Sequence, residues 1–428
     1  MPPSSARSAA TPALRLWPAL GLVALLWLLH FVPSIVEELS PTVLMIGFFG
    51  PAVCALLIVI WWLAGSRAPR REKVSGVLGL ALIGIVATFL AHPTVRGLGI
   101  VGSAVPLGAT AFVAGLVGAR WLWPSRRLAV ALGAVALVFG YWTLVRLDGV
   151  WGDFAGERTW RWRPTAEERY LAAREEPAGS GIVVAPVADA EWPGFRGPAR
   201  DAVVPGVALA EDWSDRAPRE AWRIRVGPGW SSFAVAGRSL FTQEQRGDLE
   251  VVVAYDAETG AELWAREYPS RFYEALGGDG PRATPTVADG GLFALGAEGF
   301  LHRLEPASGE IVWRADLRVD ADRKPPMWGF SSSPLVVDDL VVVHAGGEGD
   351  RGLLAYGAED GRLRWGAPAG SHSYGSAQLA QVAGDVYLSL ITDAGMTLHD
   401  PGDGAVVWRY DWPIDNYRAL QPLVVGDA

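Results

Sequence analysis

The chain has 428 residues, half of them hydrophobic, with 51 Gly, 20 Trp and a formal net charge of −9. The charge is divided unevenly: residues 1–150 hold eleven basic and four acidic side chains, whereas residues 151–428 hold 26 basic and 42 acidic ones. The acidic C-terminal part argues against nucleic-acid binding, because affinity for phosphate comes from clustered Lys and Arg. The single cysteine, Cys54, lies in an apolar run, so the C-terminal part has no disulfide and no cysteine-based metal site.

Five apolar stretches predict a helical transmembrane domain over residues 1–150. Each is close to the ~20 residues that a helix needs to cross the hydrocarbon core of a bilayer. The stretches cover residues 14–36, 42–65, 74–91, 99–119 and 128–145. The first stretch could also be a signal peptide, since Arg7 and Arg15 precede it; the lack of a convincing small-residue cleavage site and the four further stretches favour a retained helix.

The distribution of basic residues predicts how this domain is oriented. Residues 66–73 carry four positive charges and residues 120–127 carry three, whereas the connection at 37–41 is acidic and the third connection has one arginine, Arg96. Basic connections stay on the cytoplasmic side. We therefore expect a multi-pass protein of the inner (cytoplasmic) membrane, in contact with the lipid bilayer, whose chain from residue 151 onward lies on the periplasmic or extracellular side. No buried ionisable pair suggests an ion path, which disfavours transport.

A segment repeats four times in the C-terminal part. Residues 151–190 are expected to be a connector that contains one short surface helix at 165–174, and residues 191–428 to form the repeat domain. In each repeat a strand ends, a turn places a glycine, and a tryptophan follows four positions later; the tryptophans are 49, 52 and 43 residues apart. The pairs are Gly260 with Trp264, Gly309 with Trp313, Gly361 with Trp365, and Gly404 with Trp408. Four short strands in each 40–50 residues are typical of a propeller blade.

The segment at 254–264 (AYDAETGAELW) resembles the tryptophan-docking repeat of quinoprotein dehydrogenases and related PQQ-like propellers, with Ala261 where a basic residue is usual. The resemblance implies that each tryptophan packs between adjacent blades. The segment at 220–224 (EAWRI), which contains Trp222, resembles the last strand of a blade whose first three strands are missing. Residues 421–427 resemble the first strand of a fifth blade. We therefore expect an all-β quinoprotein-like propeller that is incomplete, with about four blades plus closing strands, as in a fragment truncated at its C-terminus.

Candidate site residues lie in loops that depart from what the repeat requires. Polar or aromatic side chains interrupt these loops where a plain hairpin would suffice, and we expect five of them to line one cofactor-binding pocket: Glu244, Arg246, Arg282, Trp328 and Tyr374. The alternative is that they cap blades and satisfy loop carbonyls. No catalytic residue and no metal ligand set is predicted, because His302 and His399 lack a second ligand at metal spacing.

Two functions follow from the resemblance. The first is a non-catalytic binding or assembly platform of the bacterial envelope with envelope protein partners, similar in domain to the outer-membrane assembly lipoprotein that shares this repeat. The alternative is a membrane dehydrogenase that uses PQQ and calcium, oxidises a sugar or alcohol and passes electrons to ubiquinone, as implied by the five-span membrane glucose dehydrogenases. The residues do not decide whether the protein is an enzyme.

Overall fold

The computed structural model describes residues 13–36, 40–97, 99–150, 156–174, 190–210, 212–214, 217–274, 277–414 and 417–422. Its contacts divide the chain into two units, Met1–Pro164 and Thr165–Ala428, and each unit is described by itself. The strand expected at 421–427 lies mostly outside the described residues.

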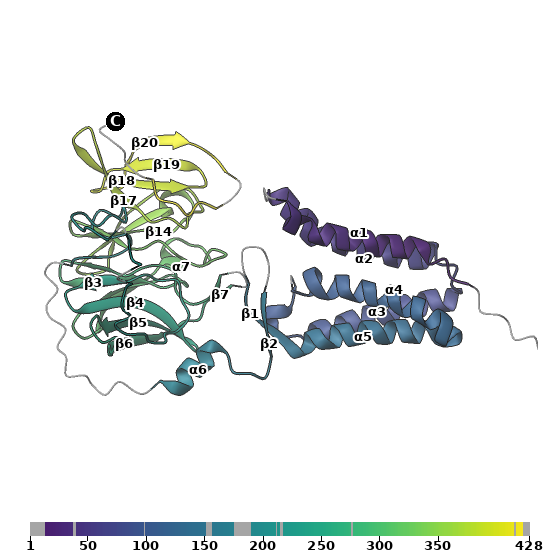
Figure 1. Ribbon diagram of the computed structural model, residues 1–428. Coiled ribbons are helices and arrows are strands. Elements are labelled where there is room, and N and C mark those ends of the chain that lie inside the picture. The colour runs from purple at the N-terminus through teal and green to yellow at the C-terminus, as the bar shows by residue number, and fades with distance from the viewer. Residues whose placement is uncertain are drawn as a thin grey trace, which may run out of the picture. The chain divides into compact units, whose positions relative to one another are not determined.

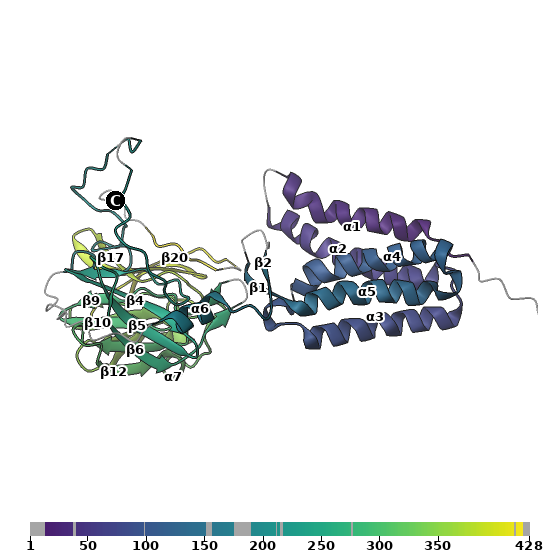
Figure 2. The same cartoon turned by 60° about the horizontal axis from the view of Figure 1, so that its bottom comes forward.

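The first unit is built from helices that lie side by side (Figures 1 and 2). The elements are α1 (Trp17–Ile35), α2 (Pro41–Ala64), α3 (Arg70–Leu90), η1 (Pro93–Val95), η2 (Ile100–Ala104), α4 (Val105–Leu122), η3 (Pro124–Arg126) and α5 (Arg127–Leu144). Four are long and apolar enough to cross a membrane: Thr42–Ala64, Arg70–Leu90, Ile100–Trp121 and Arg127–Leu144. The apolar part of α1, Trp17–Pro33, is shorter.

The packing of these helices follows the usual rule for apolar bundles, in which small residues allow close contact. Gly115 of α4 lies against the backbone of Ala131 in α5, while Trp62 and Phe112 fill the interior in an edge-to-face contact. Leucines such as Leu137, 79% exposed, point outward. A helix bundle that is surrounded by lipid has apolar side chains on its outer surface as well as in its interior.

A hairpin follows α5 directly and was not predicted from the sequence. Its strands are β1 (Val145–Val150) and β2 (Gly156–Trp160), which pair antiparallel. Arg161 begins the chain after β2, and its guanidinium donates to the carbonyls of Leu90 and Thr143. These carbonyls belong to the last turns of α3 and α5, where helix carbonyls have no partner within the helix. The hairpin is therefore tied to one end of the helices.

The second unit contains four antiparallel sheets of four strands each among the described residues, in chain order (Figure 1). The first sheet consists of β3 (Ala234–Ala236), β4 (Ser239–Arg246), β5 (Leu249–Asp256) and β6 (Glu262–Pro269), and the second of β9 (Thr286–Ala288), β10 (Gly291–Leu295), β11 (Phe300–Leu304) and β12 (Ile311–Asp316). The third sheet consists of β13 (Leu335–Val337), β14 (Leu340–His344), β15 (Leu353–Gly357) and β16 (Leu363–Ala367). The fourth consists of β17 (Gln378–Val382), β18 (Asp385–Thr392), β19 (Gly395–His399) and β20 (Val406–Asp411). A small pair, β7 (Tyr273–Glu274) and β8 (Gly278–Asp279), and α7 (Leu317–Asp320) lie in the connections. The sheets resemble propeller blades, as the repeats predict.

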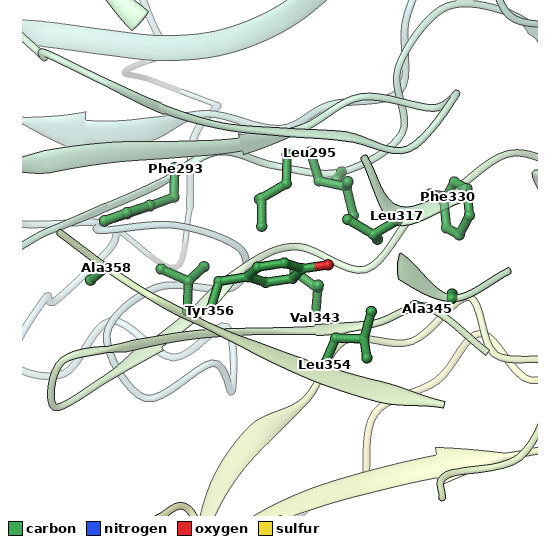
Figure 3. Close-up of a cluster of buried hydrophobic side chains, with 13 residues drawn as sticks. Phe293, Leu295, Leu317, Phe330, Val343, Ala345, Leu354, Tyr356 and Ala358 are labelled. Atoms are coloured by element: carbon green, nitrogen blue, oxygen red, sulfur yellow. The ribbon is translucent and has the colours of Figure 1, made fainter. Parts of the chain in front are cut away.

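Alternating side chains of neighbouring sheets build the core. Between the second and third sheets, Phe293, Leu295, Val343, Leu354 and Tyr356 form one buried cluster (Figure 3). The alternation explains the pattern, since every second residue of a strand faces the same neighbour. The tyrosine hydroxyl is not left unpaired: Tyr356 donates to Asp320 at 2.8 Å.

A short helix, α6 (Ala166–Ala173), lies in the segment predicted as a connector and packs on the first sheet. Thr165 and Glu168 form a capping box at its start, which satisfies two backbone donors. Glu167 accepts from the backbone of Gly247 and from Arg271. These contacts place α6 within the second unit.

Candidate functional site

The entry to each inner strand carries a hydroxyl that links neighbouring sheets. The backbone N–H of Ser232 donates to Thr284 at 3.1 Å, that of Thr284 donates to Ser333 at 2.9 Å, and that of Ser333 donates to Ser376 at 2.9 Å. Each bond joins one sheet to the next. The small polar residues that open these segments are thus required because only a short hydroxyl side chain can accept from the neighbouring backbone at this close approach.

Just before these hydroxyls, aromatic side chains gather into what we term the entry cluster: Trp328, Tyr374, Tyr417 and His372. The Trp328 ring centroid lies 5.3 Å from that of Tyr374 and 4.9 Å from that of Tyr417, and His372 meets Tyr417 edge to face at 5.6 Å. All four side chains are half-buried. Such tilted contacts at 4.5–7 Å are the favoured geometry of aromatic pairs, so the cluster is a stable, partly exposed aromatic surface.

Arg282 supports this cluster from beneath. Its guanidinium donates to the backbone carbonyls of Trp328, Asp279, Gly280 and Gly278, and it lies 4.8 Å from the centroid of the Phe272 ring. Burial lowers the pKa of Arg282. Because its donors are taken by backbone carbonyls, this arginine fixes the loop that carries Trp328.

The structure places Glu244 and Arg246, the two remaining predicted site residues, in a separate buried network under α6. Arg246 pairs with Glu244 and with Glu262, the latter at 2.9 Å. Glu244 also accepts from the hydroxyls of Tyr170 and Tyr255 at 2.9 and 3.0 Å. Burial opposes the charge on Arg246, but the two carboxylates raise its pKa above the ordinary value. Both side chains are 2% exposed, so this network holds α6 to the first sheet.

Arg200 is a buried residue that the sequence did not single out. Its guanidinium donates to the carbonyls of Ala377, at 2.7 Å, and of Ser333 and Pro334. Burial lowers its pKa to about 10. The segment that carries it also pairs with the inner strands: Trp192 bridges Val235, and the carbonyl of Pro193 accepts from Val287. Residues 192–200 therefore run along the inner strands of all four sheets as a strap.

Sequence signals for the missed residues are weak. Arg200 follows a Gly-Pro-Ala sequence in the first segment of the repeat domain, and a basic residue there reads equally well as an exposed loop side chain. Tyr417 comes after the last tryptophan repeat, where the pattern no longer assigns positions. Both acquire their neighbours only through sheet-to-sheet packing.

The predicted docking tryptophans lie against the glycine of the following sheet. Trp222, Trp264, Trp313 and Trp365 contact Gly260, Gly309, Gly361 and Gly404 in turn, all of which have φ between 66° and 76°. The first three indoles donate to the carbonyl three residues before that glycine, at 3.0, 2.8 and 2.9 Å. Trp408, in the last sheet, is 46% exposed. A residue with a Cβ would both strain the turn and strike the indole.

Acidic, histidine and cysteine side chains are dispersed in the part of the chain that the structure describes. No three of them lie together in a way that could hold a metal ion. The buried histidines are held differently: His399 contacts Thr397 and the carbonyl of Gly404, whereas both ring nitrogens of His302 have no partner within the described ranges.

Comparison with known proteins finds similarity to the second unit. A protein-family model named PQQ_2, described as outer membrane protein assembly factor BamB, matches residues 213–319 and 248–419. Two proteins of that description are related: one from Burkholderia pseudomallei is 26% identical over 193 residues (44% of this chain), and one from Shewanella oneidensis is 30% identical over 164 residues (36% of this chain). The chain spans 40% of the length of each relative.

Solved structures with low overall similarity include quinohemoprotein alcohol dehydrogenase from Comamonas testosteroni, with a TM-score of 0.32 and 16% identity over 43% of this chain and 35% of that one. They also include BamB from Moraxella catarrhalis, with a TM-score of 0.25 and 18% identity over 42% of this chain and 60% of that one. The family match, the four sheets and the tryptophan–glycine contacts agree: the chain carries PQQ-like propeller repeats, preceded by apolar helices.

Proposed function

We propose that this protein is a membrane-anchored binding or assembly platform, whose second unit is displayed on the periplasmic side of the inner membrane and docks an envelope protein at the entry cluster. The observation that carries the proposal is that some of the predicted site residues are buried in structural contacts whereas others are partly exposed. Arg282, Glu244 and Arg246 are held in buried contacts, whereas the aromatic rings of the entry cluster are half-buried and form a partly exposed surface, which we propose is the one that meets a ligand. Large aromatic side chains are enriched at protein interfaces.

The relatives support the choice of partner class. Both curated relatives are described as outer membrane protein assembly factors. A PQQ dehydrogenase remains the alternative function. When bound, PQQ supplies redox chemistry, and calcium in such a site takes oxygen ligands, mainly carboxylates. Among the described residues, no three His, Cys, Asp or Glu side chains lie together in a way that could hold a metal ion, so these residues offer calcium no such ligand set.

Site-specific photocrosslinking in cells tests the platform. A benzophenone amino acid at Met327, which is 59% exposed beside Trp328, is expected to crosslink an envelope protein, and Trp328→Ala in the same chain is expected to abolish that product. The matched control places the photoprobe at Glu258, whose side chain is 69% exposed in a turn of the first sheet. Equal products at both positions, or a product that survives Trp328→Ala, would contradict docking at the entry cluster.

The alternative has its own test. Purified full-length protein is titrated with PQQ and Ca²⁺, and the quinone absorbance and dye reduction with sugars or alcohols are followed. The platform proposal predicts neither signal. Saturable PQQ binding together with substrate-dependent dye reduction would replace the platform with the dehydrogenase.

A further inference from the structure

The hairpin at the end of α5 carries an exposed aromatic column. Trp160 and Trp162 stack with their ring planes 10° apart and centroids at 5.1 Å, and Tyr141 of α5 meets Trp160 edge to face at 6.0 Å. The three side chains are 37%, 64% and 41% exposed, in the order Trp160, Trp162, Tyr141. Tyr and Trp combine an apolar ring with a polar group, so rings exposed in this way suit a layer that solvates both.

The column continues the apolar outer surface of a helix. Tyr141 lies one turn after Leu137, which is 79% exposed, so both are on the same stripe of α5. Along this stripe the side chains change from aliphatic to phenol and then to indole. The same order of chemistry is met on passing from the hydrocarbon core of a bilayer into its headgroup layer, where Trp and Tyr are enriched.

Positive charge flanks the indoles. Arg158 and Arg163, on either side of the two tryptophans in the sequence, are exposed, and Arg158 lies 5.6 Å from the centroid of the Trp142 ring. Arg161, between Trp160 and Trp162, caps the ends of α3 and α5. Arginine beside tryptophan matches a layer that offers phosphate oxygens and a partly apolar boundary.

The opposite end of the same helices has a comparable belt. Trp17 at the start of α1 and Trp121 at the end of α4 are 66% and 75% exposed, with Arg15 and Arg120 lying 5.0 and 4.9 Å from their respective ring centroids. Between the two ends runs α5, whose 18 residues correspond to about 27 Å at the helical rise. That length is close to the ~30 Å thickness of a hydrocarbon core.

We infer that the hairpin, with Tyr141, Trp160 and Trp162, is an interfacial ledge that lies in the phospholipid headgroup layer at the non-cytoplasmic face of the membrane. The ledge fixes the depth at which the chain leaves the bilayer toward the second unit. Its occupant is the lipid surface itself, because the column is continuous with the helix stripe that faces the acyl chains. This inference rests on the membrane anchor of the proposed function.

Depth measurements in proteoliposomes test the ledge. In full-length protein with Cys54→Ala, the environment-sensitive fluorophore NBD is attached to a cysteine at one position: Trp162→Cys on the ledge, Leu137→Cys on the mid-helix stripe, or Asp385→Cys at the exposed start of β18 in the last sheet. Lipids with a nitroxide near the headgroup or deep in the acyl chain serve as quenchers. The ledge position should show blue-shifted emission that the shallow quencher removes more strongly than the deep one. The Leu137 position should show the reverse, and the Asp385 position no lipid quenching.

The outcomes separate the ledge from the anchor. If Leu137→Cys is not quenched by either lipid, the membrane anchor itself fails. If Leu137→Cys is quenched by the deep lipid while the Trp162→Cys probe emits as in water, the anchor stands and the ledge is overturned. Blue-shifted emission at Trp162→Cys without lipid quenching also overturns it, because the position is then covered by protein. Circular dichroism of each labelled protein verifies that the fold is retained.

Discussion

At the level of single residues, His302 makes the second unit sensitive to acid. The side chain is fully buried beside the Tyr268 ring at 4.4 Å, and burial, together with the charge of Arg314, lowers its pKa to about 3. An unfolded histidine has a pKa of ~6.5, so between these values the unfolded chain binds a proton that the folded one does not. Stability is therefore full above pH ~6.5 and falls as the pH drops toward 3.

His302→Leu is expected to remove this part of the acid sensitivity. Between pH 7.5 and pH 5 the native histidine should cost about 2 kcal/mol of unfolding free energy that the variant retains. Glu250 contributes with the opposite sign, because burial raises its pKa in the fold, so the measured quantity is the difference between the two proteins. Pulse proteolysis over a urea series at each pH measures the unfolding free energy of both proteins and thus this difference. The assignment is wrong if the two proteins lose equal stability on acidification.

The tryptophan contact can be isolated at Gly309. Ala in its place must adopt a φ of 67°, at a cost of about 1–2 kcal/mol. Its methyl group would also overlap the Trp264 ring, and such overpacking costs about 1–3 kcal/mol more. Gly290→Ala is the matched control, since Gly290 has a φ of 72° with nothing within 4 Å of the added methyl. Urea midpoints should therefore fall further for Gly309→Ala; equal losses would show that the indole contact contributes little.

At the level of elements, the strap at 192–200 is expected to stabilise the third and fourth sheets through Arg200. Arg200→Leu removes the donor to the carbonyls of Ser333 and Ala377, and a buried carbonyl without a partner costs about 1–3 kcal/mol. Hydrogen exchange should become faster in β13 and β17 and stay unchanged in β4 and β5. The control, Arg223→Leu, alters a side chain that is 80% exposed and should change neither. Uniformly faster exchange across all sheets would argue against a local role.

The elements that follow from local pattern were predictable, and those that depend on distant partners were not. Gly309 and Trp313 belong to one short turn and strand, so their spacing predicts the end of each sheet. The inner strands begin at Ala234 and Thr286, because the backbone N–H groups of the preceding Ser232 and Thr284 donate to hydroxyls of the next sheet instead of joining the ladder. Among the site residues, Arg282 donates to the carbonyl of Trp328, and the ring of Tyr374 lies against that of Trp328. That they line a cofactor-binding pocket stays a prediction.

The remaining differences have a common physical cause. Glu244 and Arg246 alternate along β4 with Gln243 and Gln245, so they face α6 and the glutamines point the other way. Gln243 donates to the carbonyls of Ala283 and Leu295, and Gln245 to those of Gly247 and Ser270. The sequence shows four consecutive polar residues but not which face each will occupy, because the register of the strand decides this. In the same way, the partners of Arg200 lie at least 133 residues away along the chain.

At the level of the whole molecule, the uneven charge predicts one orientation in the membrane, and the loss of that asymmetry should disturb it. The connection between α2 and α3 holds Arg67, and the first turn of α3 holds Arg70 and Arg71. Basic residues near helix ends decide which side stays in the cytoplasm. Changing these three to Gln is therefore expected to give a mixed population. The readout is a single cysteine at Asp385 in a Cys54→Ala chain, labelled in intact spheroplasts with a maleimide that cannot cross the membrane.

The parent should be labelled almost fully before lysis, and the triple variant only in part, with the remainder labelled after permeabilisation. A control with the same loss of charge changes Arg223, Arg362 and Arg409, whose side chains are 80%, 81% and 63% exposed in the second unit, and should label like the parent. Because net charge falls equally in both variants, a difference between them reports the position of the charge relative to the helices. If the parent itself is labelled only after lysis, the second unit lies in the cytoplasm and an envelope partner is excluded.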